Sequence, residues 1–273
     1  MKTLRSCLVA ALAACCVVAM PRITYGAAKI VIVNANSGSE GLNDPTAATP
    51  VGGNAGITVG QQRMIALKYA AAIWGTALNG TITISIQSQF TGLTCSTTSV
   101  VLGQAGPAYA DTSGPIPNVL YPGAVANQIV GQDLGHGTPA IVAQFNSGIG
   151  TANCQGTGWY YGFDENTGPG QFDLAEVVLH EFAHGLGFLT FTNGETGQEF
   201  VPQGQTQSIQ DVWEFMMFDL TAQTHWNRMS AADRQASGRG IPRDRRSIRT
   251  PGRKAGRART LRPCPERSVD SRS

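Results

Sequence analysis

The sequence predicts an α+β domain in which a mixed sheet packs on a long N-terminal helix and on a second helix near residue 180. Three observations favour this fold class. Apolar residues recur at helical spacing over 58–78, alternate with polar residues over 81–90, and recur at helical spacing again over 173–186. With 273 residues, of which 42% are hydrophobic, the chain is long enough to bury a sizeable core.

The first of these helices is expected to begin at Thr58, because Thr58 and Gln61 have the spacing of a capping box. It is expected to end before Asn79 and Gly80, a pair that favours a turn. Its apolar face would be formed by Met64, Leu67, Ala71, Trp74 and Leu78. The preceding segment, residues 34–56, is rich in Gly, Asn, Pro and Thr and is typical of irregular surface chain.

The clearest strand is expected over 81–90, where Ile82, Ile84, Ile86 and Phe90 share one face. Further strands are predicted over 29–35, 140–147 and 158–164. The order of helix, strands and then one strongly apolar helix is the order expected of an α+β domain.

Residues 1–28 have the pattern of a secretory signal, with a basic head followed by a short apolar run that ends near Met20. Small residues offer cleavage after Gly26 or Ala28. An alternative is a lipoprotein box that would place a lipid on Cys15, although the chain stays apolar where a polar tether is usual. We therefore expect a secreted or periplasmic cell-envelope protein, monomeric and with no membrane span in the mature chain.

Three of the six cysteines lie in the signal, which leaves Cys95, Cys154 and Cys264. An exported protein folds under oxidising conditions, so Cys95 and Cys154 are candidates for one disulfide bond. The alternative is two separate buried thiols.

Charge is divided unevenly along the chain. Residues 29–237 hold five basic and fifteen acidic side chains, whereas residues 238–273 hold twelve basic, eleven of them Arg, and three acidic. The Arg-rich segment lacks apolar periodicity, and we interpret it as disordered or out-of-frame sequence. A native basic tail that binds nucleic acid and a folded element are the alternatives; we expect no nucleic-acid partner.

The helix at 173–186 carries the candidate site. Asp173 is a suitable N-cap with Glu176 three residues on, and Gly187 can adopt the left-handed turn that ends a helix. His180 and His184 lie one turn apart on the same face, as two ligands of one Zn²⁺ would. Glu181 lies beside them as a candidate general base.

The stretch "HEFAHGLGF" resembles the active-site helix of zinc metallopeptidases of the zincin group, closest to the metzincin and leishmanolysin-like branches. The context from "GQQRMIALKYAAAIWG" through "FNS" and "GWYYGFD" to "WNRMSAADRQAS" is similar to secreted bacterial proteins of that kind. The resemblance implies that residues 29–237 are a zincin-like catalytic domain that hydrolyses peptide bonds. It also implies Zn²⁺ on His180 and His184, Glu181 as general base, and a substrate held along a strand edge, for which we expect 140–147.

One position departs from the metzincin pattern, which places a third histidine six residues after His184, where this chain has Thr190. Leishmanolysin-like enzymes take the third ligand from downstream, and the candidates here are His225, Asp211 and Glu214, or a residue lost with the reading frame after Ser237. The simpler interpretation places His225 on a surface loop and both carboxylates on the polar side of a helix.

Two functions therefore remain open at this point. The first is a secreted zinc-dependent peptidase that acts on a protein or peptide substrate. The second is a non-catalytic or inactive binding module with an incomplete metal site.

Overall fold

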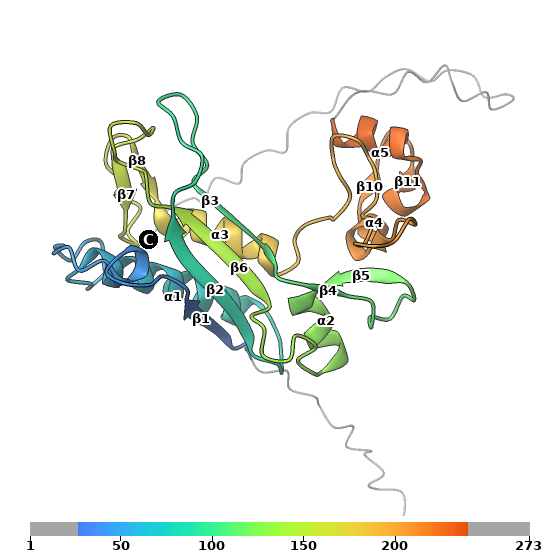
Figure 1. The fold of residues 1–273 in the computed structure, drawn as a ribbon, viewed down its shortest axis with the longest axis horizontal. Coiled ribbons are helices and arrows are strands. Elements are labelled where there is room, and N and C mark those ends of the chain that lie inside the picture. Colours follow the sequence, from blue (N-terminus) through green and yellow to red (C-terminus); the bar gives the residue numbers. More distant parts are fainter. Residues whose placement is uncertain (1–26, 240–273) are drawn as a thin grey trace, which may run out of the picture.

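The computed structural model describes residues 27–239, and Figure 1 shows their arrangement. The predicted signal, apart from Ala27 and Ala28, lies outside the described residues, as does the Arg-rich segment from residue 240 on. Ala28 belongs to the body of the fold, because it is buried and its N–H donates to the Leu78 carbonyl at 2.9 Å. No helix within 27–239 has the length and apolar character needed to cross a membrane.

A four-stranded mixed sheet forms the centre of the fold, in the order β1-β2-β6-β3. The strands are β1 (Ile30–Asn34), β2 (Ile84–Thr91), β6 (Ile141–Asn146) and β3 (Gly103–Pro107). β1, β2 and β6 run parallel, and β3 pairs with β6 antiparallel. The structure mixes helices and strands and is compatible with the predicted α+β class. The strands predicted near 29–35, 81–90 and 140–147 are present, whereas β3 was not predicted.

The expected substrate edge at 140–147 was wrong. This segment is β6, which is hydrogen-bonded to β2 on one side and to β3 on the other, so both of its edges are already paired. The border strands of the sheet are β1 and β3, and β3 is the one next to β6. Its glycines and single alanine give little β propensity, which explains why an alternating apolar pattern did not reveal it.

Two helices, α1 (Val59–Ala77) and α3 (Leu174–Gly185), contact each other and pack on the sheet. Their interface is apolar and includes fully buried side chains from both helices and the sheet, among them Leu67, Ile86, Phe145, Val178 and Phe182. α1 begins as predicted, with the Thr58 side chain accepting the Gln61 N–H. The capping box is incomplete, because the Gln61 side chain accepts from Ile57 rather than from Thr58.

Shorter elements surround this core: η1 (Gly41–Asn43), β4 (Ala110–Asp111), β5 (Val119–Pro122), α2 (Gly123–Val130), β7 (Gly158–Tyr160) and β8 (Gln171–Asp173). The strand predicted over 158–164 is the shorter β7. After α3 the chain forms a small unit, drawn in orange in Figure 1: β9 (Gln210–Asp211), α4 (Val212–Met216), β10 (Phe218–Asp219), β11 (Thr224–His225), η2 (Trp226–Arg228) and α5 (Ala231–Gly238). β9 pairs with β5 and so joins this unit to the rest of the fold.

The last described residues extend past the predicted domain boundary at residue 237. α5 continues through Gly238, and the Arg239 guanidinium donates to the Glu195 carbonyl at 3.0 Å.

The predicted disulfide is present between Cys95 and Cys154, whose Cα atoms are 5.1 Å apart. It links the loop that leads into β3 with the loop between β6 and β7. A second link between the same loops is the backbone hydrogen bond from Gln155 to the Ser96 carbonyl, at 2.8 Å. The disulfide thus ties down the chain just before the border strand of the sheet.

We expect loss of this disulfide to destabilise the protein, because the bond closes a loop of 59 residues in the unfolded chain. Replacing Cys95 and Cys154 together by Ser should lower the free energy of unfolding by about 2–4 kcal/mol. Urea unfolding of the parent and the variant, each with and without reductant, measures this. An unfolding midpoint equal to the parent's would contradict the structural role of the bond.

Candidate metal and catalytic site

The candidate site lies on α3, which begins and ends much as its sequence predicts. The Asp173 side chain caps the helix by accepting the Glu176 N–H at 3.0 Å. At the other end, Gly187 has φ +115°, a conformation that side chains rarely adopt, and the Gly187 N–H donates to the His184 carbonyl. Leu174, Val178 and Phe182 are fully buried, which turns the opposite face of α3 outward.

His180 and His184 converge on one point. Their Nε2 atoms are 3.1 Å apart, and their rings stand edge to face with centroids at 4.8 Å. Two nitrogens each ~2.0–2.1 Å from a tetrahedral Zn²⁺ would be about 3.3 Å apart. The observed spacing therefore fits two imidazole ligands of one such ion.

The hydrogen bond at the far side of the His184 ring fixes its tautomer. Nδ1 lies 2.9 Å from the Phe188 carbonyl oxygen, and a carbonyl can only accept, so Nδ1 carries the proton. Nε2 then presents a lone pair toward His180. This is the arrangement in which a histidine serves as a metal ligand.

Glu181 packs against the border strand β3. A Cβ atom added to Gly103 of β3 would be 3.0 Å from Cγ of Glu181 and 3.1 Å from Cδ1 of Phe145. Glu181 and His180 also line one cavity of about 500 Å³, with β8 and the first turns of α3 on its other sides. The Glu181 side chain is thus close to the edge of the sheet and shares a cavity with His180.

No third His, Cys, Asp or Glu joins His180 and His184 in a metal-sized cluster within residues 27–239. Thr190, the position of the metzincin third histidine, instead donates its hydroxyl to Oδ2 of Asp211 at 2.7 Å. Residues 27–239 therefore offer two candidate nitrogen ligands and one candidate base.

Asp211 is occupied by hydrogen bonds. Its Oδ2 accepts from the Thr190 hydroxyl and from the Phe191 N–H, both at 2.7 Å, and its Oδ1 accepts from the N–H groups of Trp213 and Glu214. The side chain is 1% exposed. Asp211 thus caps α4 and ties it to the segment that follows α3, so its placement on the polar side of a helix was wrong.

Glu214 is fully buried and was also misplaced on a polar helix face. It completes a capping box with Asp211 and accepts the Thr192 hydroxyl at 2.7 Å. Desolvation by burial raises the pKa of Glu214, and the nearby carboxylate of Asp211 adds to this rise. The Asp-x-x-Glu spacing of the capping box was visible in the sequence and could have indicated this structural role.

Arg234 of α5 offers Glu214 a buried counter-charge. Its guanidinium is 3.5 Å from the Glu214 carboxylate and 3.0 Å from that of Glu199, and it also donates to backbone carbonyls, including that of Met229 at 2.9 Å. Burial opposes ionisation of Glu199, but hydrogen bonds from Ser208 and other neighbours outweigh it, so the pKa of Glu199 is lowered. This network holds the unit after α3 together.

His225 lies in β11 against the Phe218 ring, with centroids 5.0 Å apart, and is half-buried rather than on a surface loop. Its Nδ1 is buried and finds no hydrogen-bond partner within the described part of the chain. It does not join the two α3 histidines in a metal cluster there.

Comparison of the chain with protein-family models, with curated proteins and with solved structures found no match.

We expect Gly103 to be required for the close approach of β3 to Glu181. Gly103→Ala should lower the free energy of unfolding by about 1–3 kcal/mol, because the new methyl group overpacks against Glu181 and Phe145. Gly106→Ala in the same strand is the control: nothing lies within 4 Å of the added Cβ, so the change should stay within about 0.5 kcal/mol. Equal urea midpoints for the two variants would show that this contact is not tight.

Proposed function

We propose that the chain is a zinc-dependent peptidase domain in which His180 and His184 bind the metal and Glu181 is the general base. The observation that carries the proposal is the 3.1 Å separation of the two Nε2 atoms, together with the fixed tautomer of His184. The resemblance of "HEFAHGLGF" to zincin active-site helices supports it. Zinc bound at this position would polarise a peptide carbonyl and make water a better nucleophile at neutral pH.

Glu181 and β3 would supply the other two functions of the site, proton transfer and substrate binding. Glu181, one position after His180 on α3, would accept a proton from the attacking water and return it to the leaving amine. β3 offers a strand edge beside Glu181, and a peptide added there in extended form would bring its backbone to the histidines. This edge replaces the one expected at 140–147.

The second candidate is a binding module in which the two histidines hold a metal without catalysis. It is favoured by the fact that residues 27–239 supply two ligands, whereas catalytic zinc sites usually have three from the protein. The two functions differ in one measurable respect. Both predict zinc binding that depends on His180 and His184, but only the peptidase predicts cleavage that depends on Glu181.

Glu181→Gln separates them. The amide keeps the shape of the side chain but cannot accept the proton, so zinc binding should stay largely intact while cleavage of casein or a quenched fluorescent peptide falls by at least ~10². Glu40→Gln is the control, since Glu40 is exposed, precedes η1 without a capping side-chain hydrogen bond, and does not line the cavity that His180 and Glu181 share. It should cleave at the parent rate.

Two results would count against the peptidase. One is cleavage by Glu181→Gln at the parent rate, which would point to a contaminating protease or to another base. The other is stoichiometric zinc binding by the parent without cleavage of any peptide in a broad library, which would favour the binding module.

A further inference from the structure

We propose that Trp213 is a positioning residue for the metal ligand His184, acting through the peptide groups of Gly187 and Phe188. The inference rests on the proposed role of His184 as a ligand. Through Trp213, the unit that follows α3 controls the geometry of that ligand.

The first step is the turn that ends α3. The Phe188 N–H donates back to the Ala183 carbonyl at 2.9 Å, and the Gly187 N–H donates to the His184 carbonyl at 3.1 Å. These bonds reverse the chain, so that the Phe188 carbonyl points back to Nδ1 of His184 at 2.9 Å. The orientation of the His184 ring therefore depends on the orientation of one peptide group just outside the helix.

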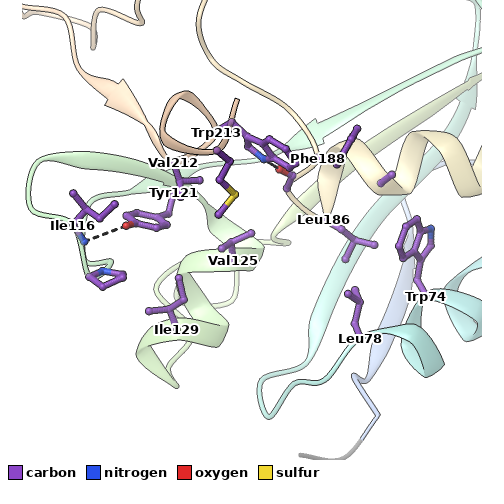
Figure 2. A pocket seen from close by; sticks show the side chains of 14 residues that line it. Trp74, Leu78, Ile116, Tyr121, Val125, Ile129, Leu186, Phe188, Val212 and Trp213 are labelled. Carbon is purple, nitrogen blue, oxygen red and sulfur yellow. Dashed lines mark hydrogen bonds between the residues drawn. The ribbon is translucent and has the colours of Figure 1, made fainter. Parts of the chain in front are cut away.

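The second step is what holds that peptide group. The Phe188 side chain is 64% exposed, so burial in the core does not fix it. Trp213 makes two contacts here. The indole Nε1–H donates to the Gly187 carbonyl, and the indole stands edge to face with the Phe188 ring, with centroids 4.7 Å apart. Figure 2 shows the Trp213 and Phe188 side chains together at the end of α3.

The third step is the placement of Trp213 itself. Its backbone N–H donates to Oδ1 of Asp211 at 2.8 Å, while Oδ2 of the same carboxylate holds Thr190 and Phe191. Asp211 thus fixes the distance between α4 and the segment just after Phe188. The Trp213 indole in turn binds the end of α3. The chain around the Phe188 carbonyl, which orients His184, is therefore held from both sides.

Loss of the indole N–H should loosen this segment. The Gly187 carbonyl would then keep only the Leu189 N–H, at 2.9 Å, so the Gly187 and Phe188 peptide groups would be held less firmly and the bond from His184 Nδ1 would weaken. Removing a direct hydrogen-bond partner of a metal-binding histidine lowers metal affinity about 10- to 100-fold. Trp213 acts one peptide group away, so we expect a loss of about tenfold, at the low end of that range.

Trp213→Phe tests this, because it keeps an aromatic ring beside Phe188 and removes the donor. Trp226→Phe is the matched control: Trp226 lies in the same unit, and its indole donates at 3.0 Å to the Ser237 hydroxyl of α5, away from α3. Zn²⁺ affinity would be measured by competition with a chromophoric chelator. The His184 tautomer would be read from ¹⁵N imidazole shifts of the metal-free protein at pH 8, and folding from circular dichroism.

We expect His184 of the metal-free parent to be protonated on Nδ1. In folded Trp213→Phe, the Nδ1–H and Nε2–H tautomers of His184 should mix. Zinc binding should be about tenfold weaker in that variant alone. A folded Trp213→Phe with the tautomer and affinity of the parent would overturn the proposal. So would a parent in which His184 is protonated on Nε2, a result that needs no variant to fold. If the parent binds no zinc, the proposed function fails, whereas the tautomer measurement still decides the role of Trp213.

Discussion

The burial of one face of α3 is the constraint on which the rest of the site depends. Leu174, Val178 and Phe182 have no exposed surface, so the helix cannot rotate about its axis without exposing them. With 3.6 residues per turn, fixing this face also fixes the direction of His180 and His184, which point away from it, and of Glu181, which borders it beside β3. The site is thus positioned by the hydrophobic core before any polar contact is made.

Polar and backbone contacts then fix the positions of the individual side chains on α3. β3 approaches α3 closely because Gly103 has no side chain, and this sets Glu181 against the border of the sheet. At the end of α3, Asp211 links the following segment to α4, and α4 presents Trp213 to the turn that orients His184. The carboxylates that looked like further metal ligands are therefore part of the scaffold.

Much of the fold followed from local patterns. The caps of Thr58 and Asp173, the alternation in β2 and the apolar spacing of α1 are properties of neighbouring residues, and the structure agrees with each. β3 escaped prediction because its sequence, "GQAGP", owes its conformation to pairing with β6 rather than to its own side chains. Pairing between distant segments of this kind leaves no periodic signal.

The site was partly predictable because some of it also depends on neighbouring residues alone. His180, Glu181 and His184 lie within one turn and a half of a helix, so their relative placement follows from helix geometry alone. The roles of Asp211 and Glu214 depend on partners about twenty residues away, Thr190 and Thr192, and the sequence did not reveal those contacts. Only the capping-box spacing indicated that these carboxylates serve the fold.

The measurement that tests the account most directly is X-ray absorption at the zinc edge on the full chain loaded with one equivalent of Zn²⁺. We predict one bound zinc whose nearest neighbours include two imidazole nitrogens at ~2.0–2.1 Å, and loss of both imidazole signals in the His180→Ala, His184→Ala double variant. A chain that retains no zinc, or a zinc shell unchanged in the double variant, would contradict it.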